Sequence, residues 1–268
     1  MTEELAGGKL RLDYPAEAVA RLTLYRPSAR NALDHETLDA IAEAMPALDR
    51  GIEVRCVVLT GTGKAFSAGY DIAAIPDESF ERDAESLVAH PFHNALEAVA
   101  AHPWPVLAAI NGHALGGGLE LALCADLRIC AAGAKLGMPP AKLGLIYGHT
   151  GLRRFIEAIG VPETKRLFLI GDTVGAQRAE RIGLVHEVVD DEELAGAAVE
   201  LAAEVAANAP ISMQGNKRAI DTLAANPTLT DEQERDLIEL RESCFASEDF
   251  REGVRAFAEK RKPSWRGR

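Results

Sequence analysis

The stretch "NGHALGGGLELAL" (residues 111–123) places four glycines and two apolar runs around a single acid, Glu120. Three consecutive glycines weaken both helix and strand propensity, so they indicate a place where another group approaches the backbone closely. A glycine-rich turn that leads into a helix also presents free N–H groups, to which the helix dipole attracts negative charge. For Glu120 two interpretations stay open: a functional acid, or an acid that only stabilises its helix end.

A second glycine-rich loop, "GTGKAFSAGYD" (61–71), follows the β-branched run "VRCVVLTG" (54–61). It is not a P-loop, because Lys64 is not followed by Ser or Thr, and not a nucleophile elbow, because Phe66 stands where that motif requires glycine. Its plain interpretation is a strand-to-helix turn. If the strands before the two loops are parallel neighbours, both loops emerge at one sheet edge, and two N–H donors can converge on one oxygen as an oxyanion hole.

Strand and helix signals alternate outward from these loops. Residues 9–27 alternate apolar and polar side chains around a proline-containing turn, which predicts a hairpin, and Asp34 is a candidate N-cap for the helix that follows. Short apolar runs then alternate with helical patterns up to about residue 133, which predicts an α/β fold with parallel strands. Beyond about residue 150 helical patterns dominate, so we expect a helical layer packed on the core or on another subunit.

Composition narrows the function classes. The chain has 268 residues, enough for a large domain without disulfides, and its four cysteines are widely spaced with no C-x-x-C, which favours reduced thiols in a cytoplasmic protein over a metal site. No apolar stretch approaches the roughly 20 residues of a membrane span. The formal charge of −12 argues against nucleic acid or anionic membranes as partners, although the tail "EKRKPSWRGR" (259–268) is basic.

Several segments, in order over nearly the whole chain, resemble the crotonase, or enoyl-CoA hydratase/isomerase, superfamily. These segments are "AFSAGYDI", "NGHALGGGLELAL", "ADLRICA", "IGDTVGAQRAERIGLVHEVV" and "AFAEKRKPSW". The resemblance implies a spiral of β-β-α units over residues 1–195 and a C-terminal helical trimerisation region over 196–268. It also implies an acyl-CoA substrate, no cofactor beyond the coenzyme A of that substrate, no metal, and self-association as a homotrimer or a dimer of trimers.

The same resemblance assigns the oxyanion-hole donors to the N–H groups of Tyr70 and Gly117, which hold the thioester oxygen while it becomes an enolate. The other residues that it places at the substrate are Arg30, Ala68, Asp71, Ile72, Pro140 and His149, with Phe257 and Lys260 at the nucleotide end from a neighbouring subunit. For His149 the sequence alone favours a helix N-terminal or loop histidine satisfied by backbone, and Lys260 is also explained as part of a solvated helix end.

Glu120 matches the first of the two glutamates that hold water in hydratases of this superfamily, and Pro140, which cannot ionise, matches the second. Together with Tyr147, this pattern resembles the methylmalonyl-CoA decarboxylase branch, although that branch carries histidine in place of Tyr70. The leading prediction is therefore decarboxylation of a short malonyl-type thioester such as methylmalonyl-CoA, with Tyr147 near the substrate carboxylate. The alternatives are an enoyl-CoA hydratase or isomerase with Glu120 as sole acid/base, and an inactive CoA-binding or assembly protein.

Overall fold

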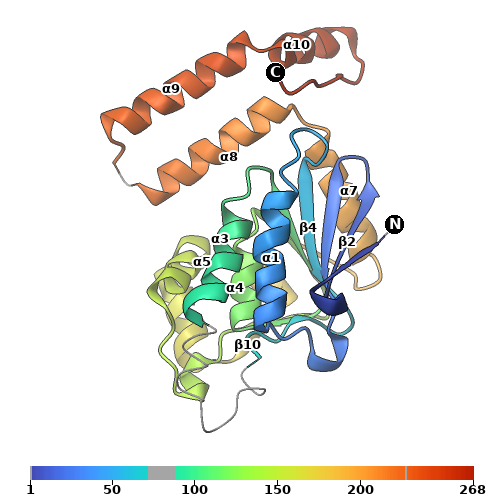
Figure 1. Ribbon diagram of the computed structural model, residues 1–268. Coiled ribbons are helices and arrows are strands. Elements are labelled where there is room, and N and C mark those ends of the chain that lie inside the picture. The colour runs from blue at the N-terminus through green and yellow to red at the C-terminus, as the bar shows by residue number, and fades with distance from the viewer. Residues whose placement is uncertain (1, 72–87, 227) are drawn as a thin grey trace.

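Two β-sheets run side by side through the molecule, with helices packed against them. The computed structural model describes residues 2–71, 88–226 and 228–268 (Figure 1). Among these residues one sheet has seven strands in the order β1-β2-β3-β4-β6-β8-β11, and the other has four in the order β10-β9-β7-β5. The larger sheet contains β1 (Glu3–Leu5), β2 (Leu10–Ala16), β3 (Val19–Leu24), β4 (Cys56–Gly61), β6 (Val106–Ile110), β8 (Leu127–Ala131) and β11 (Glu187–Val189). The smaller sheet contains β5 (Ala65–Ser67), β7 (His113–Leu115), β9 (Lys135–Gly137) and β10 (Thr173–Gly175).

The strands that precede the two glycine-rich loops are parallel neighbours. β4 pairs with β6 in the larger sheet, and β5 pairs with β7 in the smaller one, with Ser67 opposite Ala114. β6, β7 and α4 (Gly117–Leu123) form one β-β-α unit, and β8, β9 and α5 (His149–Ile170) form the next. The prediction of a parallel α/β architecture is confirmed, and both loops leave the smaller sheet at the same edge.

The N-terminal hairpin and the first helix have the predicted form. β2 and β3 pair antiparallel. Helix α1 (His35–Ala47) begins after Asp34, whose carboxylate accepts a hydrogen bond from the Thr37 N–H at 2.9 Å, which satisfies one of the free donors of the first turn. Side chains at helical spacing along α1 are buried in the main core: Leu38, Ile41 and Met45.

Asp34→Ala is expected to lower the free energy of unfolding by about 1–2 kcal/mol. The variant loses the N-cap and the ion pairs of Asp34 with Lys9 at 2.8 Å and Arg26 at 3.3 Å. Urea denaturation measures the loss. Asp39→Ala, an exposed position on the same helix, is the matched control and should leave the unfolding midpoint almost unchanged; equal midpoints for the two variants would contradict the role of the cap.

Helices cover both faces of the larger sheet because its strands are apolar on both sides. In β4, Val57 and Leu59 belong to the core cluster that includes α1, whereas Cys56 and Val58 belong to the cluster that includes α7 (Leu194–Ala206). This alternation is the two-residue period of a strand. The same cluster as α1 contains α3 (His93–Ala100), which follows a π-helical turn at Val88–Phe92, and α6 (Ala176–Arg181).

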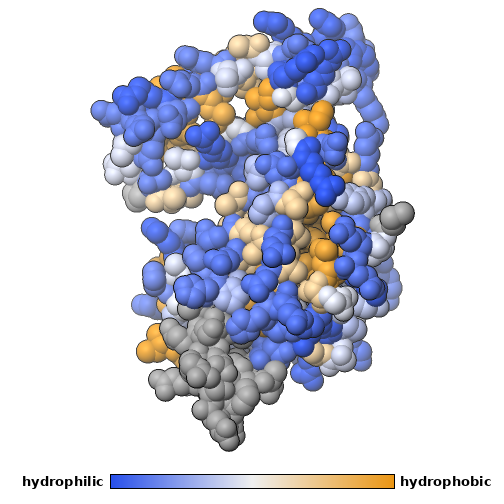
Figure 2. Space-filling view, in the orientation of Figure 1, coloured by the Kyte–Doolittle hydropathy of each residue, from blue (hydrophilic) through white to orange (hydrophobic). Residues whose placement is uncertain are grey.

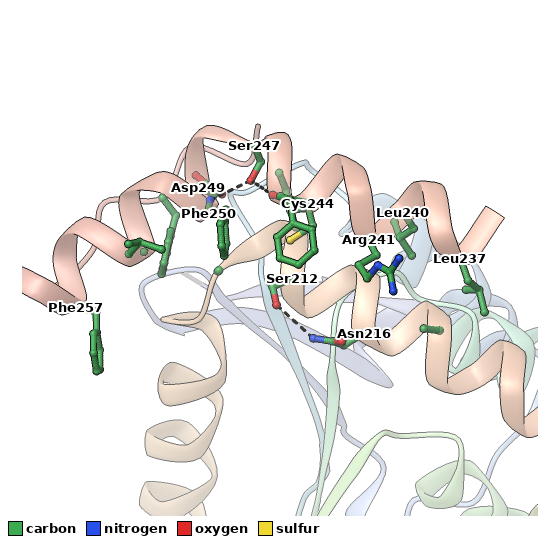
Figure 3. A pocket seen from close by; sticks show the side chains of 18 residues that line it. Ser212, Asn216, Leu237, Leu240, Arg241, Cys244, Ser247, Asp249, Phe250 and Phe257 are labelled. Atoms are coloured by element: carbon green, nitrogen blue, oxygen red, sulfur yellow. Dashed lines mark hydrogen bonds between the residues drawn. The ribbon is translucent and has the colours of Figure 1, made fainter. Parts of the chain in front are cut away.

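Three further helices form an arm above the sheets, at the top of Figure 1: α8 (Pro210–Ala225), α9 (Asp231–Ala246) and α10 (Glu248–Glu259). Ser247 separates α9 from α10 and caps α10, because its hydroxyl accepts a hydrogen bond from the Phe250 N–H at 3.0 Å. The three helices line a cavity of about 700 Å³, into which Phe250 and Leu240 project (Figure 3).

Large apolar side chains are exposed on the arm that α8, α9 and α10 form. Figure 2 shows hydrophobic residues between its helices. Its exposed large apolar side chains are Ile220, Leu223, Ile238, Phe245, Phe250, Val254 and Phe257, the last of which is 88 % exposed. Exposed apolar patches of this kind mark interaction surfaces. Trimerisation through the C-terminal region and the division of the chain at residue 195 both remain predictions.

The described part of the chain contains neither a single helix suited to span a membrane nor a cluster of metal-binding side chains. No single helix there is long and apolar enough to span a membrane; α7 and α8 reach that measure only as a pair, with a 102° bend between them. No cluster of three or more metal-binding side chains occurs in those residues. The four cysteines are free, and burial raises the pKa of Cys56, Cys124 and Cys130 to about 12.

Candidate active site

The two glycine-rich loops touch each other backbone to backbone where β5 and β7 end. Gly69 has a φ of +92°, and a Cβ atom there would lie 2.8 Å from the Leu115 carbonyl oxygen and 3.2 Å from the Gly117 nitrogen. Gly116 has a φ of 52° and a ψ of −127°, a conformation that side chains disfavour. The glycine run predicts that another group approaches its backbone closely, and that group is the backbone of the other glycine-rich loop.

Two backbone N–H groups at this contact have no hydrogen-bond acceptor among the described residues. The Leu33 N–H donates to the Gly69 carbonyl oxygen at 2.8 Å, and the Asp71 N–H donates to the Leu33 carbonyl oxygen at 3.0 Å, so the Tyr70 N–H between them points away from this pairing. Gly117 is the first residue of α4, where N–H groups have no partner in the helix. Within residues 2–71, 88–226 and 228–268, neither the Tyr70 N–H nor the Gly117 N–H donates a hydrogen bond. Two adjacent free donors are what an oxyanion hole requires.

Glu120 lies one helical turn beyond Gly117, between α4 and α5. Its side chain is buried, with 3 % of the residue exposed, and its Oε2 accepts a hydrogen bond from the Tyr147 hydroxyl. Gly151 on α5 provides the space for this contact: a Cβ atom there would lie 2.7 Å from Glu120 Oε1 and 2.6 Å from Tyr147 Cε1. The carboxylate is therefore held at the contact between the two helices, on the same helix as one of the free N–H groups.

The surroundings of Glu120 bias it toward proton transfer. Burial raises its pKa above the usual value, while the hydrogen bond from Tyr147 and the positive charge of Arg154 oppose that rise. Burial also raises the pKa of Tyr147, so its phenol remains a donor at neutral pH. A buried carboxyl with a raised pKa and a fixed hydrogen-bond donor is typical of a general acid/base.

Tyr70 contributes a side chain to the site as well as its N–H group. Its ring packs edge-to-face on Phe92, with the ring centroids 4.5 Å apart. A Cβ atom on Gly117 would lie 3.1 Å from Tyr70 Cε1 and 3.2 Å from the Phe92 ring, so the two rings cover the Gly117 end of α4. Burial, and the charge of Glu120 after it, raise the pKa of the Tyr70 phenol.

Other residues expected at the substrate lie around these loops. The Ala68 N–H donates to the Arg30 carbonyl oxygen at 3.0 Å, and Arg30 itself is exposed, with a positive φ of 52°. Asp71 is engaged in an ion pair with Arg26 at 2.9 Å. Ile72 lies outside the described residues.

The remaining candidates fall in two places. Pro140 is buried at the start of a 3-10 turn (Pro140–Leu143), and His149 is the exposed first residue of α5. Phe257 and Lys260 lie on and just after α10, at the opposite end of the molecule from α4 and α5 (Figure 1), so a single chain does not bring them to Glu120. Their role at the nucleotide end remains a prediction that requires a neighbouring subunit.

Three residues of the site are absent from the sequence-based prediction: Gly69, Phe92 and Gly151. Gly151 had a local signal, the glycine pair of "GHTG" (148–151) at the start of a helical pattern, which indicates close helix packing. Phe92 had none, because a single aromatic residue in an apolar segment is most often a core residue.

Comparisons with known proteins identify one family. Residues 15–268 match the family described as enoyl-CoA hydratase/isomerase. The chain is 35 % identical over 257 residues to a crotonyl-CoA hydratase of Syntrophomonas wolfei, covering 93 % of this chain and 95 % of that protein. It is 35 % identical over 249 residues to a short-chain-enoyl-CoA hydratase of Clostridium acetobutylicum, covering 91 % and 92 %. The crystal structure of an enoyl-CoA hydratase from Bacillus anthracis superimposes with a TM-score of 0.88 at 34 % identity, covering 97 % of this chain and 100 % of that one.

Proposed function

We infer that this chain, which belongs to the enoyl-CoA hydratase/isomerase family, hydrates a short 2-enoyl-CoA thioester with Glu120 as its only carboxylate acid/base. One observation carries the proposal: the buried Glu120 accepts a hydrogen bond from Tyr147 one turn away from the free N–H of Gly117. This arrangement supports the proposal, because a fixed proton acceptor then lies one helical turn from one of the two proposed oxyanion donors. The prediction of an acyl-CoA enzyme of the crotonase superfamily agrees with the family match and the hydratase relatives.

The proposed reaction uses the two free N–H groups to polarise the thioester. The substrate carbonyl oxygen accepts hydrogen bonds from the Tyr70 and Gly117 N–H groups, which draws electrons from Cβ. Glu120 takes a proton from water, the water oxygen bonds to Cβ, and the electron pair of the double bond moves toward the carbonyl oxygen as an enolate. Protonation of Cα completes the addition of water. Each oxyanion donor stabilises the transition state by roughly 2.7–4 kcal/mol.

The hydrogen bond from Tyr147 to Glu120 favours hydration over decarboxylation, the reaction that the sequence predicts first. The Tyr147 hydroxyl donates to Glu120, so it is not free to hold a substrate carboxylate. An ionised Glu120 at the same place repels a malonyl-type anion. The printed names of the relatives, crotonyl-CoA hydratase and short-chain-enoyl-CoA hydratase, describe hydration of unsaturated thioesters.

Decarboxylation remains the second candidate on account of Pro140. That buried residue has no ionisable group, so it cannot act as the second carboxylate that two-acid hydration uses, and loss of CO2 needs an oxyanion hole but no strong base. Assays of the purified protein with crotonyl-CoA and methylmalonyl-CoA decide between the two. Loss of the conjugated thioester without CO2 release supports hydration; CO2 release alone overturns it, and binding of both thioesters without turnover indicates a CoA-binding protein.

Tyr147→Phe is expected to move the acid limb of the pH–rate profile to higher pH. The hydrogen bond from Tyr147 stabilises the charged form of Glu120 and lowers its pKa, so its removal raises that pKa and leaves less carboxylate at a given acidic pH. Hydration should be weakened most at acidic pH and should recover as pH rises. The measurement is kcat/KM for crotonyl-CoA against pH, with Tyr25→Phe as the control. If the acid limb does not shift, the pKa that it reports belongs to a group other than Glu120.

A further inference from the structure

Arg154 lies where three helices around the site, α3, α4 and α5, come together. It follows Gly151 by three positions on α5, so it lies on the helix face that contacts Glu120. Its Nη2 donates to Glu97 Oε1 on α3 at 2.5 Å. Arg154 also lines a cavity of about 1020 Å³ together with Cys124, the residue that ends α4 one turn after Glu120. One side chain therefore connects the contact between α4 and α5 to α3.

The guanidinium of Arg154 has a positive charge that Glu97 neutralises only in part. The Glu97 side chain is 49 % exposed, so water weakens its attraction, whereas the Arg154 side chain is 21 % exposed. The Arg154 Nε is buried and has no hydrogen-bond acceptor among residues 2–71, 88–226 and 228–268. The charge that remains acts on Glu120, where it opposes the effect of burial on the pKa of the carboxyl.

A carboxyl that takes a proton from water must first be ionised, and burial disfavours the ionised form of Glu120. Tyr147 stabilises that form through a hydrogen bond, but its phenol carries no charge at neutral pH. An arginine stays charged throughout the pH range in which a carboxyl titrates, so its contribution is constant. Other titratable groups that interact with Glu120 are Tyr70, the exposed His93 on α3, and Cys124.

We propose that Arg154 is a positioning residue: held by Glu97, it supplies the positive charge that balances the buried Glu120 carboxylate across the contact between α4 and α5. This inference rests on the proposed function, in which Glu120 is the base. Arg154 acts through Glu120 and not on the substrate. The charge is therefore what the position requires, and its loss should reduce the rate only at pH values at which Glu120 becomes protonated.

Arg154→Met removes the charge and keeps an unbranched side chain. An opposite charge favours the carboxylate, so its loss raises the pKa of Glu120, and we expect the acid limb of kcat/KM for crotonyl-CoA to move up by about 1 pH unit. Below the limb kcat/KM should fall about 10-fold, and above it the rate should approach that of the wild type. Arg154→Lys keeps the charge and should return most of the limb to its original position.

Two further variants complete the set. Arg153→Met is the matched control, because Arg153 is the neighbouring residue on α5 but is 66 % exposed and pairs with Glu157 of the same helix at 3.3 Å; its limb should stay at the wild-type pH. Glu97→Gln changes an exposed position, and the glutamine oxygen still accepts the hydrogen bond from Arg154. Since this variant removes a competing negative charge, its limb should lie at or below the wild-type pH.

Titration of Glu120 itself separates this proposal from the proposed hydration. In protein labelled with carbon-13 at the glutamate carboxyl carbons, the NMR signal of Glu120 is the one that Glu120→Gln removes, and its shift against pH gives the midpoint without substrate. We expect the midpoint to be about 1 pH unit higher in Arg154→Met than in the wild type, and to return in Arg154→Lys. Urea denaturation at pH 7 establishes that each variant is folded.

The outcomes distinguish the two proposals. Equal Glu120 midpoints in Arg154→Met and the wild type would overturn the role of Arg154. A raised midpoint that Arg154→Lys fails to lower, or that Glu97→Gln shares, would overturn it as well, because the shape of the side chain and not its charge would then be the cause. The expected midpoints in a protein that does not hydrate crotonyl-CoA would support the role of Arg154 and overturn the proposed hydration.

Discussion

Glu120→Gln is expected to lower kcat for hydration of crotonyl-CoA by about 10²–10⁴-fold while the protein stays folded. The amide has the shape of the carboxylate, and its carbonyl oxygen still accepts the hydrogen bond from Tyr147. It cannot accept a proton from water. The loss should therefore appear in kcat much more than in KM, since the N–H groups that bind the thioester oxygen are untouched.

The stability of the Glu120→Gln variant is a second readout. A carboxyl whose pKa is higher in the folded protein than in the unfolded chain contributes stability below its unfolded pKa and loses that contribution as pH rises through the folded pKa. At pH 7 the uncharged glutamine carries no such cost, so the urea midpoint should equal or exceed that of the wild type. Glu43→Gln, exposed on α1, is the control. A Glu120→Gln variant with the wild-type rate would place the base on another residue.

Gly69→Ala is expected to lower kcat by about 10²–10³-fold, the effect of losing one oxyanion donor. The added Cβ atom meets the Leu115 carbonyl oxygen at 2.8 Å and the Gly117 nitrogen at 3.2 Å, and the φ of +92° is unfavourable for alanine. Relief of these contacts separates the Gly117 N–H from the Tyr70 N–H. The two donors then no longer converge on one oxygen.

Gly51→Ala is the matched control for the backbone strain. Gly51 also has a positive φ, +63°, but a Cβ atom there would meet no atom within 4 Å, so this variant reports the cost of the left-handed backbone alone, roughly 1–2 kcal/mol. Steady-state kinetics and urea denaturation of the two variants separate lost activity from lost stability. Wild-type kcat in folded Gly69→Ala would show that the two N–H groups do not act together.

Local sequence patterns predict the strands, the loops and the helix cap around the site. The β-branched run before the loop at 61–71 and the apolar run before 111–123 predict strands of a parallel sheet, and the structure shows that these strands, β4 and β6, are neighbours. Asp34 is the N-cap that its position predicts. The helical pattern over 230–259 predicts one helix, whereas Ser247 separates α9 from α10; a serine followed by Glu248 and Asp249 is typical of a helix start and was the signal for this break.

The contacts that determine the chemistry had no such signal. Tyr147 is 27 residues from Glu120 along the chain, and their hydrogen bond depends on how closely α5 approaches α4. Periodicity indicates which face of a helix is buried but not which polar group it meets there. The ring of Tyr70 illustrates the same limit: the loop pattern predicts its N–H, whereas its packing on Phe92 depends on a segment more than 20 residues away.

Gly151 has a consequence for anyone who would evolve this site in the laboratory. Since the missing Cβ atom is the space in which Glu120 and Tyr147 meet, any larger residue at 151 displaces both groups at once. Libraries that randomise Glu120 or Tyr147 and keep Gly151 will yield active variants through single substitutions. A library that also varies position 151 will yield active variants only when all three positions change together, so the number of simultaneous substitutions limits which new activities this fold can reach.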